Sequence, residues 1–161
     1  MDDRGPQATL TAWMGPGDAN ILGPVHGGAI MKLCDEAASL AAIRHAHARV
    51  VTAACDRMTF LVPVFVGELV TLSARVNAVW RSSMEVGVRV EAENPMTGDR
   101  RHSNSAYLTL VAVDEGGRPI EVAPLQPSDD EGRRREREAQ IRRANRLAER
   151  ERLKSERDDA P

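Results

Sequence analysis

The sequence predicts an α+β fold in which a curved antiparallel sheet wraps around one long central helix. Three observations support this prediction. Residues 26–48 carry apolar and small side chains at helical spacing on most sides, and such a helix has to be covered by other elements. A short strand-like segment precedes it, and four strand-like segments follow it. A sheet curved around the helix is the most economical way to bury both.

The predicted helix is entered through two glycines and carries one conspicuous acid. Its apolar positions recur every three or four residues at Ile30, Leu33, Cys34, Ala37 and Ala41. Gly27 and Gly28 place N–H groups at the positive end of the helix dipole, where they suit an anion or a developing oxyanion. Asp35 lies in mostly apolar surroundings, where a carboxylate needs a partner or a chemical role. The alternative is that Asp35 lies on an exposed edge of the helix.

Strands are expected at residues 8–14, 50–57, 69–79, 84–92 and 101–113. The third and fourth of these alternate between apolar and polar residues, which is typical of antiparallel strands with one buried and one solvated face. The last is apolar or small on both faces in its second half, as expected of a central strand. Residues 60–67 form an apolar connection that Pro63 interrupts and Gly67 closes.

Composition limits the class of protein. The chain has 161 residues, of which 42% are hydrophobic but only 3% aromatic, so Val, Leu, Ala and Ile must build the core. A net charge of −2 and a pI of about 6.1 give no basic bias toward nucleic acid or anionic lipid. No apolar run is long enough to span a membrane, and the acidic start lacks a secretory pattern. We therefore expect a cytoplasmic protein without nucleic-acid or membrane partners.

The two cysteines and four histidines do not suggest a metal site. Cys34 and Cys55 lie among apolar residues without CxxC spacing, so we expect buried thiols in a reducing cytosol. His45 and His47 are most simply cations near the end of the helix. No spacing of His, Cys, Asp and Glu resembles a zinc site, and no metal is expected.

The chain divides into a folded domain at residues 1–122 and a linker with a charged tail at residues 123–161. Residues 128–161 hold 11 Arg and Lys against 10 Asp and Glu, a net charge of +1. A thin apolar stripe includes Ile141, Ala144, Leu147 and Ala148. This pattern favours a solvated or partly disordered helix laced with i,i+4 ion pairs. A nucleic-acid-binding tail is the alternative, which the interleaved acids argue against.

Several separated motifs, in the right order, resemble a known family. They are Asp18-Ala19-Asn20, His26-Gly27-Gly28, Asp35-Glu36-Ala37, and segments at 60–68, 81–86 and 93–98. Together they resemble the hotdog-fold acyl-CoA thioesterases, most closely the cytosolic long-chain acyl-CoA hydrolase branch. The larger members of that branch carry two such domains in tandem. The resemblance covers roughly residues 8–115 and implies a single hotdog domain here.

The resemblance also implies an assembly and a site. Two subunits of this family pair their sheets edge to edge, and the active sites lie at the dimer interface. The family's catalytic acid falls on Asp35, and the asparagine used by the tandem enzymes falls on Asn20. A homodimer would therefore supply Asn20 from one subunit and Asp35 from the other. The branch further implies a trimer of dimers.

Hydrolysis of a fatty acyl-CoA is the implied reaction. Asp35 would be the general base for water, or the nucleophile, and Asn20 would orient the water or the thioester. The N–H groups of Gly27 and Gly28 would polarise the carbonyl. His26 is grouped with these glycines as a binding residue, because a histidine at a helix start more often forms a hydrogen bond than performs chemistry. No cofactor is expected, since coenzyme A is part of the substrate.

The segment Arg81, Ser82, Ser83 and Met84 resembles the family segment that lines the CoA arm. Arg100 and Arg101 are candidates for the CoA phosphates, with solvated strand-end charges as the alternative. Two other functions are considered. One is a non-catalytic acyl-CoA-binding regulatory protein with the same fold. The other is hydration or dehydration of an acyl thioester, for which His26 lacks an evident acidic partner.

Overall fold

A computed structural model of the chain describes residues 6–158. Five strands form one antiparallel sheet in the order β1-β3-β4-β5-β2. Their bounds are β1 Gln7–Trp13, β2 Arg49–Phe60, β3 Leu69–Val79, β4 Ser83–Glu93 and β5 Arg100–Val113. Two α-helices, α1 Gly27–Ala46 and α2 Asp130–Asp158, and a short 3₁₀ turn at Pro16–Asp18 complete the elements. The α+β hotdog architecture expected from the sequence is confirmed.

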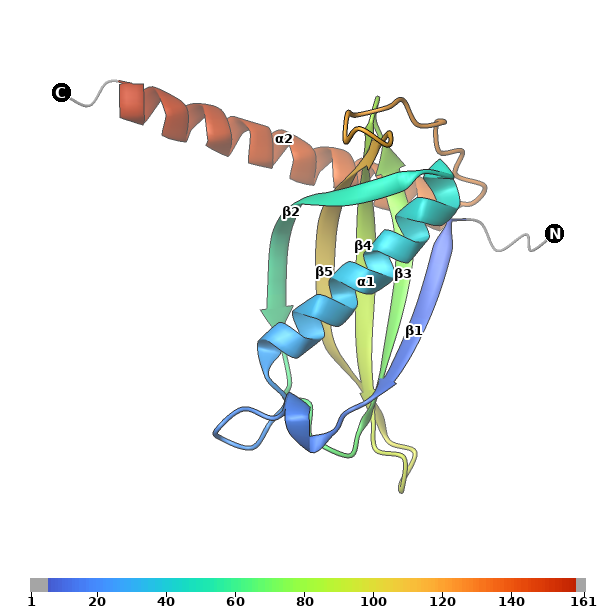
Figure 1. Cartoon of the computed structure of the whole chain (residues 1–161), viewed down its shortest axis with the longest axis vertical. Helices are drawn as coiled ribbons and strands as arrows, with labels where there is room; N and C mark the ends of the chain where they lie inside the picture. Colours follow the sequence, from blue (N-terminus) through green and yellow to red (C-terminus); the bar gives the residue numbers. More distant parts are fainter. Residues whose placement is uncertain (1–5, 159–161) are drawn as a thin grey trace. The chain divides into compact units, whose positions relative to one another are not determined.

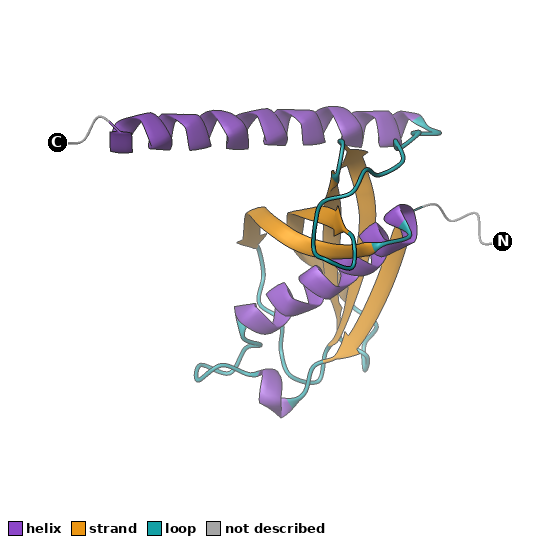
Figure 2. Ribbon diagram, turned by 45° about the horizontal axis from the view of Figure 1, so that its top comes forward, coloured by secondary structure: helices purple, strands orange, loops and turns teal. Residues whose placement is uncertain are grey.

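Helix α1 lies across the concave face of the sheet, as Figures 1 and 2 show, and contacts all five strands. Its buried side chains are Ile30, Cys34, Ala37, Ala38, Ala41 and Ala42. Small residues let the sheet approach the helix closely, so the core needs few aromatic side chains. The helix ends at His47, whose φ of 50° is left-handed and whose N–H donates to the carbonyl of Ile43.

The apolar residues that alternate along β3 and β4 form much of the core, as predicted. Val70, Leu72, Ala74 and Val76 of β3 and Met84, Val86, Val88 and Val90 of β4 are buried. Strand β5 is an interior strand between β4 and β2, and β2 forms one edge of the sheet. Strand β2 is longer than predicted, because Met58, Thr59 and Phe60 continue the pairing with β5 beyond a bulge.

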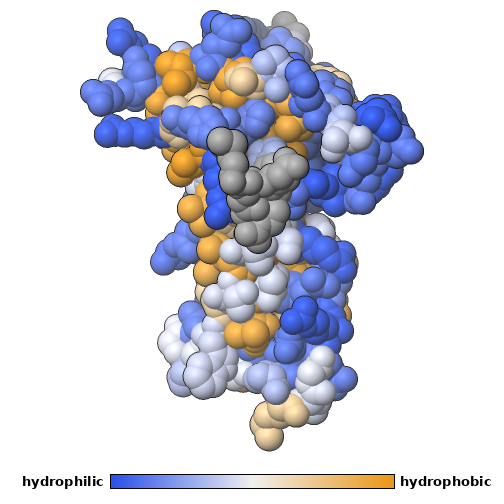
Figure 3. Space-filling view, turned by 90° about the vertical axis from the view of Figure 1, so that its right-hand side faces the viewer, coloured by the Kyte–Doolittle hydropathy of each residue, from blue (hydrophilic) through white to orange (hydrophobic). Residues whose placement is uncertain are grey.

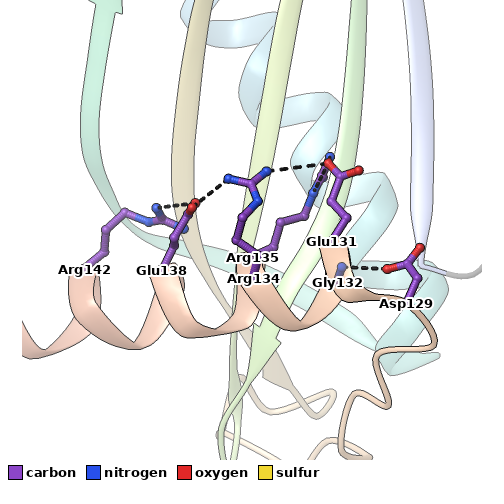
Figure 4. A network of polar contacts seen from close by, with 7 residues as sticks. All are labelled: Asp129, Glu131, Gly132, Arg134, Arg135, Glu138 and Arg142. Carbon is purple, nitrogen blue, oxygen red and sulfur yellow. Dashed lines mark hydrogen bonds and ion pairs between the residues drawn. The ribbon is translucent and has the colours of Figure 1, made fainter.

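The chain divides into two compact units, of which the first ends at Pro124 and the second begins at Leu125. In the second unit, α2 begins at a cap in which the Gly132 N–H donates to Asp129 Oδ1 at 2.6 Å. Ion pairs one turn apart follow along its surface, including Arg135 with Glu131 and Arg134 with Glu138, both at 2.7 Å (Figure 4). The charged C-terminal helix is thus confirmed. Neither helix within residues 6–158 has the length and apolar character needed to cross a membrane.

Some large apolar side chains remain exposed outside the core. Trp13 at the end of β1 is 75% exposed, and Ile21 and Leu22 in the loop before α1 are almost entirely exposed. Figure 3, which views the side where β1 forms the edge, shows apolar atoms interspersed with polar ones. Exposed apolar groups of this size commonly mark surfaces that contact another chain or a ligand.

Candidate functional site

The start of α1 is held by its own cap and by the neighbouring loops. His26 precedes the first turn, and its Nδ1 accepts a hydrogen bond from the Gly28 N–H at 2.9 Å. The imidazole therefore satisfies one of the free N–H groups of the first turn. The Gly27 N–H has no partner among residues 6–158 and remains available at the positive end of the helix. Of the two donors predicted from the sequence, one is occupied by His26.

Asp35 lies about two turns into α1, where it is half-buried. Its Oδ1 accepts a hydrogen bond from the hydroxyl of Thr52 on β2 at 2.5 Å. The carboxylate is therefore neither in bulk water nor enclosed in the core, but at the edge where α1 meets β2. Sequence reasoning did not find Thr52, because it lies 17 positions away on another element and no local pattern marks it.

Asn20 lies in a tight loop between the 3₁₀ turn at Pro16–Asp18 and α1. Its Oδ1 accepts from the Leu22 N–H at 2.7 Å, and its own N–H donates to the carbonyl of Pro24 at 2.8 Å. This is the usual behaviour of asparagine in a turn. Within a single chain, Asn20 is hydrogen-bonded inside its own loop and Asp35 is hydrogen-bonded to Thr52. No hydrogen bond joins Asn20 to Asp35 among residues 6–158. The loop exposes Ile21 and Leu22 beside Asn20.

A cavity of about 380 Å³ opens beside the start of α1. Its lining is mostly apolar and consists of Pro24, Val25, Gly27, Ile30, Phe60, Leu61, Val62, Pro63, Val64 and Ser103. Backbone hydrogen bonds fix its walls: Val25 donates to Val64 at 2.7 Å and Leu61 donates to Ser103 at 2.8 Å. A volume of this size and a mostly apolar lining fall within the range found for small-ligand sites.

Arg101 anchors one wall of this cavity. Its guanidinium donates to both carboxylate oxygens of Glu68, at 2.6 and 2.7 Å, and to the carbonyl of Pro63 at 2.8 Å. The hydrogen bonds from Arg101 hold the pKa of Glu68 below its ordinary value, and the carboxylate in turn raises the pKa of Arg101. Arg100 is paired with Glu93 at 2.5 Å. Both arginines proposed for phosphate therefore already hold a carboxylate.

The segment predicted to line the CoA arm lies elsewhere in the chain. The carbonyl of Arg81 accepts from Val122 and that of Ser82 from Ala112, each at 2.9 Å, and Met84 is fully buried in the core. Ser83 pairs with Val111 near the end of β5, whereas the cavity lies near the beginning of that strand. One chain does not bring Arg81–Met84 together with the start of α1.

Two further expectations concern the cysteines and metals. Cys34 is buried, and burial raises the pKa of its thiol to about 12. Cys55 is exposed on β2, so the prediction of a second buried thiol was wrong. Cys55 lies on the edge strand β2, which has a neighbouring strand on one side only, so fewer side chains pack around it and none of the residues of β2 is buried. Within residues 6–158, no group of three or more His, Cys, Asp or Glu is placed to hold a metal ion.

Comparisons with known proteins agree on one family. The sequence profile of the Thioesterase superfamily matches residues 22–98. An uncharacterized acyl-CoA thioester hydrolase of Bacillus subtilis is 39% identical over 116 residues, which cover 72% of this chain and 67% of that protein. The cytosolic acyl coenzyme A thioester hydrolase of Rattus norvegicus is 34% identical over 131 residues, 80% of this chain. The chain spans about a third, 34%, of the length of that rat protein.

Solved structures give the same answer for the fold. An apo-hexameric acyl-CoA thioesterase superposes with a TM-score of 0.86 at 38% identity, covering 89% of this chain and 92% of that one. An acyl-CoA hydrolase of Staphylococcus aureus, solved with butyryl coenzyme A, coenzyme A and coenzyme A disulfide, gives 0.85 at 31% identity, covering 95% and 93%. Variants of that hydrolase with one asparagine, one aspartate or one threonine replaced by alanine are also solved. In that protein the aspartate follows the asparagine by 15 positions and precedes the threonine by 17.

Proposed function

The chain belongs to the thioesterase superfamily, and from this premise we propose that it hydrolyses fatty acyl-CoA to a free fatty acid and coenzyme A. The observation that carries the proposal is the Asp35 carboxylate on α1, which accepts a hydrogen bond from the Thr52 hydroxyl on β2. The first turn of the same helix borders the cavity. Relatives named acyl-CoA thioester hydrolases support the substrate class. A cytosolic location is part of the proposal, and the relative named cytosolic acyl coenzyme A thioester hydrolase supports it.

Asp35 acts as the general base in this proposal. It takes a proton from water as the water oxygen attacks the thioester carbonyl. The tetrahedral oxyanion then collapses, the carbon–sulfur bond breaks, and the departing thiolate receives the proton from Asp35. Attack by the carboxylate itself, through an anhydride, is the alternative. The hydrogen bond from Thr52 keeps the charged carboxylate oriented toward the β2 edge.

Asn20 of a second subunit completes the site. The order and spacing of Asn20, Asp35 and Thr52, 15 and 17 positions, equal those of the three residues replaced in the S. aureus hydrolase. The exposed Ile21 and Leu22 beside Asn20 support a loop that packs against another chain. A hexameric relative supports a homodimer that assembles further, as a trimer of dimers.

The carbonyl oxygen is polarised at the start of α1. The free Gly27 N–H is the first donor, and the Gly28 N–H becomes a second one if the His26 imidazole releases it. His26 thus binds and positions rather than attacks. The apolar cavity beside Gly27 receives the acyl chain. Arg81, Ser82 and Ser83 contact the CoA arm from another subunit, since within one chain they lie far from α1's first turn. The side chain of Met84 is buried in the core and does not take part.

Replacement of Asp35 by asparagine tests this function. The amide keeps the shape of the side chain but cannot accept the proton, so the rate of free-thiol release from an acyl-CoA panel should fall by about 10²–10⁴-fold. Oligomeric state and thermal stability should match those of the natural chain. A variant that retains full turnover would refute the proposed role of Asp35.

A non-catalytic acyl-CoA-binding protein is the second candidate. The occupied Gly28 N–H is the observation that favours it, because it leaves only one free donor for an oxyanion. That candidate predicts saturable acyl-CoA binding without thiol release from the unmodified chain. The free-thiol assay therefore separates the two functions before any variant is made.

A further inference from the structure

Asn104 on β5 is a polar residue in the apolar inner face of the sheet. It is fully buried, and its neighbours on the same face of β5, Ala106, Leu108 and Leu110, are apolar. Neither its Nδ2 nor its Oδ1 has a hydrogen-bond partner among residues 6–158. A buried amide without partners is costly, and native structures seldom retain one without a reason.

The register of the sheet places this amide next to the cavity. Asn104 is paired with Phe60 of β2, and residues directly opposite on antiparallel strands point to the same face. The ring of Phe60 lines the cavity and reaches the start of α1, where a Cβ on Gly27 would lie 3.4 Å from it. The adjacent Ser103 also lines the cavity. Asn104 therefore points to the same face of the sheet as Phe60, the face that α1 covers, although Asn104 is not itself part of the cavity lining.

Contacts with α1 fix the depth of the amide. It approaches the thiol of Cys34, an interaction that opposes the rise in the pKa of Cys34 caused by burial. A thiol is only a weak hydrogen-bonding group, so this contact does not satisfy the donors and the acceptor of the amide, which have no other partner among residues 6–158. Ile30, one turn before Cys34 on the same face of the helix, lines the cavity. Asn104 thus lies where the cavity ends and the tightly packed core of small residues begins.

We propose that Asn104 is a polar stop at the inner end of the acyl cavity and disfavours acyl chains long enough to reach it. This inference rests on the proposed binding and hydrolysis of acyl-CoA. An alkyl chain that extends past Ile30 would place methylene groups against the amide, which offer it no hydrogen bond and exclude water from it. A short acyl group would leave room for water at this end, and that water could bond to the amide.

Two replacements separate polarity from size. Asn104→Leu removes the polar group and keeps the number and branching of the side-chain heavy atoms, whereas Asn104→Ala removes polarity and volume together. We expect the ratio of kcat/KM for dodecanoyl-CoA to that for butyryl-CoA to rise about tenfold in the leucine variant and further in the alanine variant. Thr109→Val is the matched control. Its hydroxyl is likewise buried on β5 without a hydrogen-bond partner among residues 6–158, but Thr109 does not line the cavity, so the ratio should not change.

Each outcome bears on the inference. An unchanged ratio in both Asn104 variants overturns it, as does a change with alanine alone, which would make size the determinant. Loss of folding in both variants would also overturn it, because a merely structural amide explains that result. Thermal melting of the leucine variant at or above the natural temperature is expected. If the unmodified chain releases no thiol, the proposed function fails, and the same ratio measured as binding constants still tests Asn104.

Discussion

The two long helices of this chain use charge in opposite ways. Helix α1 buries six small or apolar residues, and its candidate catalytic acid, Asp35, has a specific partner on β2. Helix α2 carries many charges that pair one turn apart on its own surface (Figure 4). A charge that water already stabilises can be replaced at little cost, whereas a carboxylate held by a hydroxyl of another element has a defined geometry to lose. The charge on α1 is therefore a candidate for catalysis, whereas the charges on α2 serve mainly to keep that helix solvated.

Removal of the Thr52 hydroxyl should produce the largest effect in this comparison. Thr52→Val keeps the shape of the side chain but deletes the hydrogen bond to the Asp35 carboxylate. Hydrogen bonds to charged groups contribute about 1.5–3 kcal/mol, so kcat/KM should fall by about 10–100-fold. Steady-state kinetics with a short acyl-CoA measure this. Thr52→Ser, which retains the hydroxyl, is the control and should lose much less.

The Arg101–Glu68 pair is an intermediate case, because it is partly buried and holds the cavity wall. Arg101→Ala should lower the free energy of unfolding by about 1–3 kcal/mol at pH 7, between the values for exposed and buried pairs. Urea denaturation at neutral pH, with the natural chain alongside, measures this difference.

The same pair makes a prediction about pH. Glu68 has a pKa lowered in the folded state, so its contribution is complete above its ordinary pKa of 4.5 and is lost as the pH falls through the lower folded value. The stability difference between the natural chain and Arg101→Ala should therefore shrink below pH 4.5. A difference that stays constant down to pH 3 would contradict the assignment of this pair.

The smallest effect is expected on α2. Glu138 pairs with Arg134 at 2.7 Å and lies 3.9 Å from Arg142, each one turn away. Such surface pairs contribute about 0.3–0.5 kcal/mol, so Glu138→Gln should change the melting temperature only slightly and acyl-CoA turnover not at all. A large loss of turnover in this variant would contradict the claim that the charges of α2 play no part in catalysis.

The periodicity of apolar residues was sufficient to predict the fold, because the spacing of these residues in α1, β3 and β4 matches the faces of those elements that are buried. Asp35 and Asn20 were found through motifs. Thr52 was not found in this way, since its contact with Asp35 depends on the position of β2 against α1. The exposure of Cys55 depends on which strand forms the edge, and a single sequence does not reveal that order.

The partners of Arg101 and His26 were hidden for a similar reason. Arg101 and Glu68 are 33 positions apart and meet only because the connection after β2 folds back on β5. His26 was expected to form a hydrogen bond, but its acceptor role toward Gly28 depends on the rotamer of the ring. Local patterns predict elements, whereas ion pairs and caps across elements require coordinates.

Mixing two inactive variants tests most directly the proposal that each site is shared between subunits. Asn20→Ala and Asp35→Asn should each abolish most thiol release when expressed alone. When the two chains are co-expressed, half of randomly formed dimers pair one of each and hold one intact site, so about a quarter of the natural activity should return. Co-expressed chains that stay as inactive as either parent would contradict a site built from Asp35 of one subunit and Asn20 of its partner.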